Sequence, residues 1–152
     1  MYAVVPSPLG NLVLRASAKG LTHLGFTEEG VTEVPADLQD AVRQLGAYFA
    51  RESQEFTVPL DPQGSDHDLQ HWRELLTVPY GSTVSYREIA ARLGTPGGAR
   101  AVGQCNARNP IAILVPCHRV VSASGELTGY AGGIWRKQWL LGHESSQGSL
   151  GL

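Results

Sequence analysis

A cysteine and a histidine stand side by side at Cys117-His118, inside the apolar stretch from Val115 to Val121. A thiolate is a strong nucleophile, but an ordinary cysteine has a pKa near 8.5, so roughly 3% of it is ionised at neutral pH. A neighbouring imidazole backed by a carboxylate can supply the shift of about 1.5 units, or about 2 kcal/mol, that ionises half of it. The pair is therefore compatible with a nucleophilic thiol. Taken alone it favours the alternative, a small buried cysteine beside a histidine that faces solvent, and the rest of the chain reverses this preference.

The composition sets limits on where such a thiol works. A chain of 152 residues is long enough for one domain, or two small ones, with a sizeable core. No apolar stretch reaches about 18 residues, and the first residues lack a basic region followed by an apolar run. Two cysteines do not make a disulfide framework, which favours a reducing interior. We expect a cytoplasmic protein without membrane contact and, by default, a monomer.

Charge is distributed unevenly along the chain. Residues 1–66 carry four Lys/Arg against nine Asp/Glu, a net charge of −5, whereas residues 67–152 carry eight against five, a net charge of +3. Seven of the eight basic residues in the second part are arginine, whose planar head with several donors suits phosphates and bases. The asymmetry modestly favours a nucleic-acid partner for the part that holds Cys117.

The first part of the chain has the pattern of a small α/β domain. Three short apolar runs separated by turns predict strands, at residues 2–5, 12–16 and 21–27. A helix is expected next, with four apolar residues at helical spacing: Leu38, Val42, Leu45 and Phe49. Residues 56–60 could form one more strand. Residues 62–65 have the composition of a linker, so we expect two domains, at residues 1–65 and 66–152.

The second part is predicted to be mostly helical. One helix starts after Ser65, and Ser85 with Glu88 has the spacing of a capping box that opens another. After a break at residues 94–97, a helix of mostly small residues follows at 98–106, which together with its predecessor outlines a helix-turn-helix. Arg100 is the long side chain of this small-residue helix. Such a smooth helix suits close approach to a groove better than sequence reading, which needs several long polar side chains.

The remaining elements would position the cysteine. The apolar run 111–115 predicts a strand leading directly to Cys117, so the Cys-His pair is expected at a strand end beside the small-residue helix. Residues 134–142 fit a final helix that ends near Glu144.

The stretch from Trp72 to Glu144 resembles the C-terminal domain of the O6-alkylguanine-DNA alkyltransferases, or methylated-DNA–protein-cysteine methyltransferases. The shared segments occur in order: Pro79-Tyr80-Gly81 with Ser85-Tyr86, Ala99-Arg100-Ala101-Val102-Gly103, Asn109-Pro110, Pro116-Cys117-His118-Arg119-Val120, Gly129-Tyr130-Ala131-Gly132-Gly133, and Trp139-Leu140-Leu141 before His143-Glu144. Residues 1–66 resemble the family's N-terminal domain only in length and outline. The pattern looks closest to bacterial constitutive members.

The resemblance implies an α+β fold. Its parts would be a small N-terminal α/β domain, ribonuclease H-like with an antiparallel sheet, and a mostly helical C-terminal domain with a winged helix-turn-helix. It also implies DNA repair by direct damage reversal, in which the cysteine takes a methyl or other alkyl group from O6-alkylguanine in duplex DNA after base flipping. Whether O4-alkylthymine is also accepted stays open.

By the family pattern, five residues carry this reaction. Cys117 accepts the alkyl group, and His118 receives its proton through a water. Glu144 orients the imidazole, Asn109 braces the site, and Tyr86 donates a hydrogen bond to the purine as the base departs. A methylated cysteine is a thioether that does not readily release its methyl group, so we expect a single irreversible transfer per molecule.

The resemblance also assigns residues to DNA. Arg100 would fill the space left by the flipped base, and Tyr130 would form a wall of the pocket. The backbone carbonyls of Cys117 and Val120 would recognise the guanine amino group. Small residues would let the backbone approach the minor groove without sequence specificity: Ala99, Ala101, Gly103 and Gly132. No nucleotide-binding motif is found, and no cofactor or metal is expected.

Two other classes stay open from the residues. One is a non-enzymatic winged-helix protein, either a regulator or an alkyltransferase-like protein that binds lesions without repairing them. The retained Cys117 argues against it, because such relatives lack the acceptor thiol. A turnover enzyme such as a cysteine hydrolase is the second class. There, the adjacency of Cys117 and His118 is awkward, since the partners of a catalytic triad normally come from separate segments.

Overall fold

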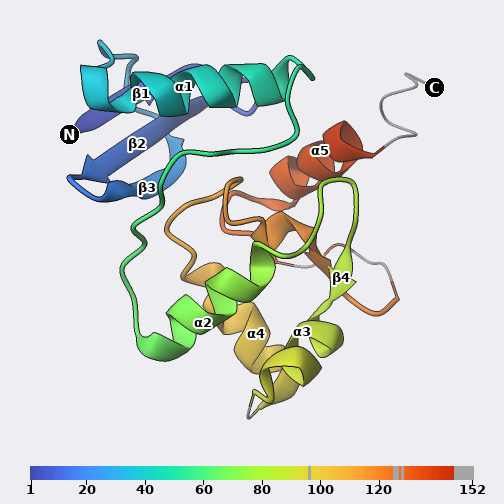
Figure 1. Cartoon of the computed structure of the whole chain (residues 1–152). Coiled ribbons are helices and arrows are strands. Elements are labelled where there is room, and N and C mark those ends of the chain that lie inside the picture. Colours follow the sequence, from blue (N-terminus) through green and yellow to red (C-terminus); the bar gives the residue numbers. More distant parts are fainter. Residues whose placement is uncertain (96, 125–126, 128, 146–152) are drawn as a thin grey trace. The chain divides into compact units, whose positions relative to one another are not determined.

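The computed structural model describes residues 1–95, 97–124, 127 and 129–145. The chain forms two compact units (Figure 1). One unit comprises Met1–Gln63 together with Pro110–Leu114, and the other comprises Gly64–Asn109 together with Val115–Leu152. Within the described part, no helix is both long and apolar enough to cross a membrane.

The first unit is a three-stranded antiparallel sheet with one helix packed against it (Figure 1). The strands follow each other in the order β1-β2-β3, with bounds Tyr2–Val5, Asn11–Ser17 and Gly20–Thr27. Helix α1, Ala36–Phe49, buries five residues: Leu38, Ala41, Gln44, Leu45 and Tyr48. The three predicted strands, the helix and the antiparallel sheet are confirmed. The buried aromatic of the last turn is Tyr48, whereas the helical spacing had favoured Phe49.

Two further predicted strands are wrong. Of residues 56–60, only Leu60 bridges to β3, at Leu21, because the preceding Pro59 has no backbone N–H to extend a ladder. Of residues 111–115, only Ile111 bridges to β3, at Leu24, and the chain then turns. Residues 111–115 are buried except for the half-buried Ala112, whereas residues 56–60 are half-buried or exposed. Neither run continues a sheet.

The second unit contains a helix-turn-helix. Helix α2, Asp66–Leu75, starts where the Ser65 side chain accepts a hydrogen bond from the Asp68 N–H at 3.1 Å. Ser85 caps α3, Tyr86–Leu93, in the same way, accepting from the N–H of Glu88 at 3.0 Å. Helix α4, Gly98–Ala107, follows and packs against α3 (Figure 1). The predicted capped helix and the small-residue helix are therefore confirmed.

The rest of this unit surrounds the cysteine. Two short parallel strands, β4 (Val84–Ser85) and β5 (Val120–Val121), pair beside a 3₁₀ helix, η1 (Cys117–Arg119). The last helix is α5, Ile134–Glu144. Cys117 thus begins a 3₁₀ helix, and the expectation that it follows a strand is wrong, because the chain turns over residues 112–115.

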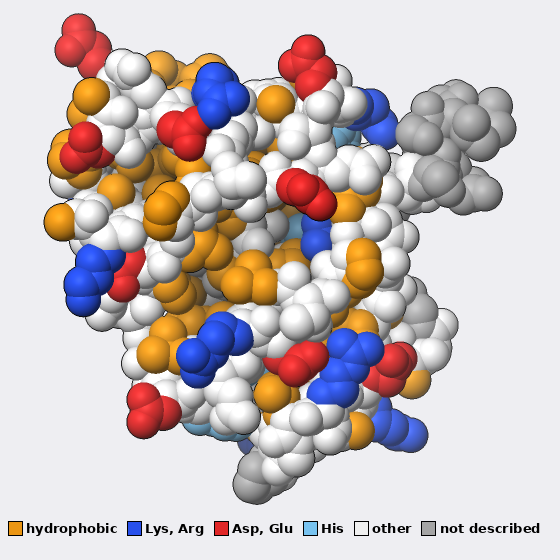
Figure 2. Space-filling view, viewed as in Figure 1, with side chains coloured by type: hydrophobic (Ala, Val, Ile, Leu, Met, Phe, Trp, Pro, Cys, Tyr) orange, Lys and Arg blue, Asp and Glu red, His pale blue; other side chains and the backbone are white. Residues whose placement is uncertain are grey.

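The Lys and Arg side chains do not form one continuous basic surface on the face shown in Figure 2, where Asp and Glu side chains lie among them. On this face, contacts with a polyanion would come from separate basic side chains.

Candidate active site

The Cys117 thiol is buried beside an asparagine. Only 6% of Cys117 is exposed. The Asn109 side-chain amide donates to the sulfur at 3.2 Å and to the carbonyl oxygen of Val115 at 2.9 Å. One amide therefore holds the backbone just before the cysteine and directs an N–H at the reactive atom. Such a donor stabilises a thiolate more than a thiol, because its partial positive charge faces the sulfur.

His118 and Arg119 share a carboxylate from the end of α5. The Nε2 atom of His118 lies 2.8 Å from Oε2 of Glu144. Arg119 donates to both oxygens of Glu144, at 2.7 and 3.0 Å, and to the carbonyl oxygen of Val78 at 2.7 Å. All three charged or polar side chains are buried. The carboxylate is therefore neutralised by the arginine whether or not the imidazole carries a charge.

The protonation state of this cluster follows from its contacts. Burial raises the pKa of Glu144, but the hydrogen bonds from His118 and Arg119 outweigh it and bring the pKa to about 2. Burial lowers the pKa of His118, against the hydrogen bond to Glu144, which raises it. An ionised carboxylate only accepts, so Nε2 of a neutral His118 carries the hydrogen. Nδ1 is then the basic nitrogen, and it has no hydrogen-bond partner among the described residues.

The thiol itself is less acidic than an ordinary cysteine. Burial raises the pKa of Cys117, and the Asn109 hydrogen bond and the charge of Lys137 only partly oppose this. The expected lowering by the neighbouring imidazole is therefore not found, because a neutral histidine supplies no positive charge. At rest the cluster holds a protonated thiol next to a neutral base.

Lys137 connects the cysteine to Tyr86. It lies on α5 and is fully buried. Its Nζ atom is 3.4 Å from the Tyr86 hydroxyl oxygen and 5.6 Å from the centre of that ring. The same charge acts on the pKa of Cys117, so thiol, ammonium and phenol lie within electrostatic reach of one another.

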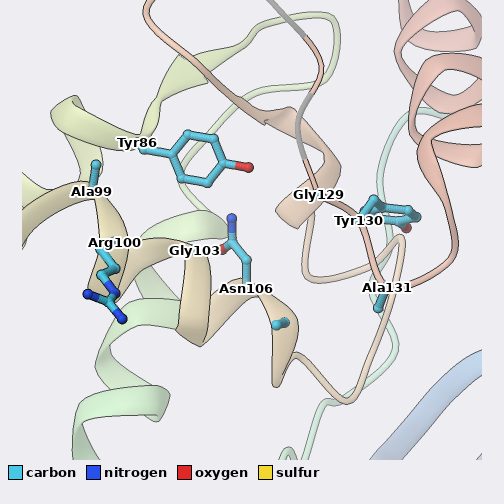
Figure 3. A pocket seen from close by; sticks show the side chains of 9 residues that line it. Tyr86, Ala99, Arg100, Gly103, Asn106, Gly129, Tyr130 and Ala131 are labelled. Carbon is cyan, nitrogen blue, oxygen red and sulfur yellow. The ribbon is translucent and has the colours of Figure 1, made fainter.

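A cavity of about 650 Å³ opens beside α4 (Figure 3). Its wall comes from the start of α3, from α4 and from the loop before α5, with these lining residues: Tyr86, Ala99, Arg100, Gly103, Asn106, Ala107, Gly129, Tyr130 and Ala131. The hydroxyl of Tyr86 and the amide of Asn106 point into the same space, whereas the Arg100 side chain points away from it (Figure 3). A volume of this size accommodates a small aromatic ligand.

Tyr130 places this cavity near the cysteine. Burial raises the pKa of Tyr130, and the charge of a Cys117 thiolate raises it further. The phenol therefore stays protonated at neutral pH. The cavity wall thus includes one residue coupled to the sulfur directly and another, Tyr86, coupled to it through Lys137.

The structure brings most of the predicted residues into these two places. Cys117, His118, Glu144 and Asn109 form the buried cluster, and Tyr86, Arg100, Tyr130, Ala99 and Gly103 line the cavity. Three predicted residues are in neither set. Ala101 is half-buried on α4. Val120 pairs with Val84 and donates its N–H to the carbonyl oxygen of Cys117. The carbonyl oxygen of Gly132 accepts a hydrogen bond from Arg136 at 2.8 Å.

Two members of the cluster were missed by the sequence reading. Arg119 and Lys137 were counted among the basic residues of the second part and given no role at the site. A signal for Lys137 was present, because it lies three residues before Leu140 and seven before Glu144, a helical spacing that places all three on one face of α5. No comparable pattern marks Arg119. Within the described ranges, no group of three or more His, Cys, Asp or Glu side chains could hold a metal ion.

Comparisons with known proteins find relatives for both the N-terminal and the C-terminal part of the chain. Residues 66–146 match the family model of the 6-O-methylguanine DNA methyltransferase DNA binding domain, and residues 1–62 match that of its ribonuclease-like domain. A methylated-DNA–protein-cysteine methyltransferase from Mycolicibacterium paratuberculosis is 52% identical over 150 residues, which cover 94% of this chain and 91% of the relative. One from Methanosarcina barkeri is 44% identical over 148 residues, covering 92% and 94%.

A solved structure is similar over the same length. The crystal structure of Mycobacterium tuberculosis OGT in complex with DNA superposes with a TM-score of 0.88 at 51% identity, covering 96% of this chain and 93% of that one. The predicted α+β fold, with a ribonuclease-like N-terminal part and a helical DNA-binding part, is confirmed. Because the two family models together match most of the chain, it is a member of the 6-O-methylguanine DNA methyltransferase family.

Proposed function

We propose that this protein repairs duplex DNA by moving an alkyl group from O6 of a damaged guanine to the sulfur of Cys117, once per molecule. The observation that carries the proposal is the buried thiol, which has an amide donor on one side and a histidine with a free basic nitrogen next to it in the chain. Relatives about half identical to this chain are named methylated-DNA–protein-cysteine methyltransferases, and one similar structure is a complex with DNA.

Proton removal is the first step of the proposed reaction. The thiol is protonated at rest, so its proton must pass to a base before sulfur can attack an sp³ carbon. Nδ1 of His118 is that base, directly or through a water molecule. The imidazolium formed is then stabilised by Glu144, and the thiolate by the Asn109 amide. Both stabilising groups are already in place before the proton moves.

Alkyl transfer follows in one displacement. The sulfur–carbon bond forms as the carbon–O6 bond breaks, and the electron pair of that bond passes into the guanine ring. The departing base takes up a proton and becomes ordinary guanine. The Tyr86 hydroxyl, beside the Lys137 ammonium, donates to the purine as this charge develops. The product is a cysteine thioether, which does not readily release its alkyl group, so each molecule acts once.

Access to the thiol requires that the base leave the duplex. The cavity beside α4 accepts it, with Tyr130 as one wall, and the small residues of α4 let the helix approach the minor groove. Arg100, which is exposed and points away from the cavity, fills the vacated space in the stack. The carbonyl oxygens of Cys117 and Val120 recognise the guanine amino group.

The proposal also covers organisation and location. Residues 66–152 bind DNA and accept the alkyl group, and residues 1–65 form a separate domain; the family-model bounds support this division. Both cysteines are free, which suits a reducing compartment. We place the protein in the cytoplasm as a monomer.

Mass spectrometry of peptides tests the reaction. The protein is mixed with an excess of duplex DNA that carries one O6-methylguanine, and it should gain one methyl group on the Cys117 peptide and none after Cys117→Ser. Many demethylated duplexes per protein would instead identify a turnover enzyme. Tight binding with no change in mass would identify a lesion-binding protein without repair activity.

A second experiment tests base flipping by Arg100. Flipping costs a few kcal/mol, so Arg100→Ala should slow transfer from duplex DNA by about tenfold or more. Transfer from a free O6-alkylguanine base needs no flipping and should be unchanged. Arg73→Ala, which removes an exposed arginine of α2, is the matched control. Equal losses on both substrates would contradict the role of Arg100.

A further inference from the structure

One polar group of the cavity has no role in the reaction described so far. Asn106 lies in the last turn of α4, and its amide points into the cavity toward the Tyr86 hydroxyl (Figure 3). Its oxygen, Oδ1, lies 2.8 Å from Nε2 of His71 on α2. Its nitrogen, Nδ2, has no hydrogen-bond partner in the described part of the chain. The cavity therefore contains an amide donor that the protein itself leaves unused.

The sense of this amide is set by His71. A carbonyl oxygen only accepts, so the imidazole Nε2 that faces Oδ1 donates to it. His71 is 1% exposed, and burial lowers its pKa, so the ring is neutral and has one N–H to give. Rotating the amide by half a turn would place two N–H donors face to face. The histidine thus holds the oxygen away from the cavity and turns the N–H₂ group toward it.

The end of α4 that carries Asn106 is also anchored. The indole N–H of Trp72, next to His71 on α2, donates to the carbonyl oxygen of Cys105 at 3.1 Å. Arg108, just after α4, donates to the Asp68 carboxylate of α2 at 2.7 Å. These contacts lie on either side of the His71–Asn106 bond. The amide nitrogen is therefore held in place from the α2 side, as a preorganised recognition group should be.

We propose that Asn106 donates a hydrogen bond from Nδ2 to a ring nitrogen of the extruded alkylated purine, and that His71 is the positioning residue that fixes this donor. The inference rests on the proposed function, because it needs the base to enter the cavity. Asn106 would then select the base by the hydrogen-bond acceptors that the base presents, and it would do so next to the Tyr86 hydroxyl.

The chemistry of the lesion suits such a donor. Guanine carries a hydrogen on N1, but alkylation of O6 removes it and leaves N1 with a lone pair. An O6-alkylguanine therefore offers only acceptors on its ring nitrogens, at N1, N3 and N7. A hydroxyl can donate or accept, whereas an amide nitrogen can only donate. A fixed N–H₂ group thus favours a purine that presents a ring acceptor to it. When the purine presents none, the amide donor is buried without a partner, which costs binding free energy.

Single-turnover transfer from methylated duplex DNA tests the proposal. Asn106→Leu has a similar volume and no donor, and it should slow methyl transfer by about tenfold, the effect of one lost hydrogen bond. The assay is repeated with three substrates in which N1, N3 or N7 of the O6-methylguanine is replaced by C–H. The loss caused by Asn106→Leu should vanish on one of the three. An unchanged rate on the parent substrate, or an equal loss on all three analogues, would overturn the proposal.

Further variants separate recognition from structural support. Asn106→Asp keeps the acceptor for His71 but presents no donor to the cavity, so it should keep the melting temperature and still lose rate. His71→Leu should show the same analogue profile as Asn106→Leu and add less than about twofold to it in the double variant. Gln104→Ala, an exposed α4 residue that does not line the cavity, is the control. A melting temperature that falls together with the rate in Asn106→Asp would indicate a structural role only.

The parent protein keeps the two proposals apart. If it transfers no methyl group to Cys117, the proposed function fails. If it does so and Asn106→Leu transfers as fast, only the role of Asn106 fails.

Discussion

The two cysteines of this protein have similar surroundings and are proposed to have different chemistry. Cys117 is 6% exposed and Cys105 is 1% exposed. Each sulfur accepts a hydrogen bond, from Asn109 at 3.2 Å and from Arg108 at 3.3 Å. Burial raises the pKa of both thiols. Neither burial nor a single donor therefore identifies the nucleophile.

The charges around the two sulfurs differ in their balance. Near Cys105, a hydrogen bond and the negative charge of Asp68 raise the pKa beyond the effect of burial, and the charge and hydrogen bond of Arg108 oppose them. Near Cys117, the charge of Lys137 lowers it, and the adjacent His118 has a free basic nitrogen. Both sites contain a carboxylate held by an arginine, but only at Cys117 does the histidine bond that carboxylate and keep its other ring nitrogen unused; His71, near Cys105, donates to Asn106 instead. A cation lies near both sulfurs, so the proton acceptor beside Cys117 is the feature that separates the proposed nucleophile from Cys105.

The largest expected effect is on which thiol is modified. In the Cys117→Ser protein, the Cys105 peptide should gain no methyl group even after long incubation with methylated DNA. Cys105→Ala should transfer within about twofold of the parent, a change of less than about 0.5 kcal/mol. Peptide masses and single-turnover rates measure the two effects. Methylation of Cys105 in either protein would contradict the distinction between the two sites.

The second-largest expected effect is on stability, where the Glu144 and Asp68 carboxylates should differ. Glu144→Gln leaves the buried Arg119 without a charged partner and should cost about 3 kcal/mol in the free energy of unfolding. In the other pair, the Arg108 side chain is 52% exposed. Asp68→Asn should therefore cost about 1 kcal/mol or less. Urea denaturation at pH 7 measures both, and equal costs would remove the contrast.

The sequence predicted the elements better than their connections. Periodicity and capping residues indicated β1–β3, α1, α3 and α4, because each is encoded by local spacing. Residues 111–115 misled, since an apolar run is equally suited to a strand and to a buried turn. Here the run has one bridge, at Ile111, followed by Ile113 with a positive φ of 72°. A β-branched residue in that conformation is imposed by its surroundings and cannot be inferred from the sequence.

At the candidate site, too, the sequence predicted the residues better than the contacts between them. The resemblance pointed to Cys117, His118, Glu144 and Asn109. The structure pairs Asn109 with Cys117 and His118 with Glu144, and their roles in the reaction stay predictions. The pKa direction of the thiol could not be predicted, because it depends on how fully the site is buried. Partners that lie far apart in the sequence, such as Asn106 with His71, were also beyond local patterns.

Lys137 gives a smaller, kinetic contrast. Lys137→Met removes the cation that lowers the pKa of Cys117 and contacts the Tyr86 hydroxyl, so methyl transfer should slow by about tenfold. The pH at which iodoacetamide alkylates Cys117 should rise at the same time. Arg73→Met, which removes an exposed cation of α2, is the control. A slower transfer without any change in the alkylation profile would place the effect on Tyr86 alone.

The smallest expected effect is that of pH on the transfer rate. Burial lowers the pKa of His118 from 6.5, so the base becomes protonated, and is lost, only below that value. Burial raises the pKa of Cys117 above that of an ordinary cysteine, so the thiol stays protonated at rest up to alkaline pH. Between pH 6.5 and 8 neither group changes its charge, and single-turnover rates at saturating protein should vary by less than about twofold. A rate that rises tenfold per pH unit over this interval would mean that a preformed thiolate reacts without help from His118. The histidine would then no longer distinguish Cys117 from Cys105.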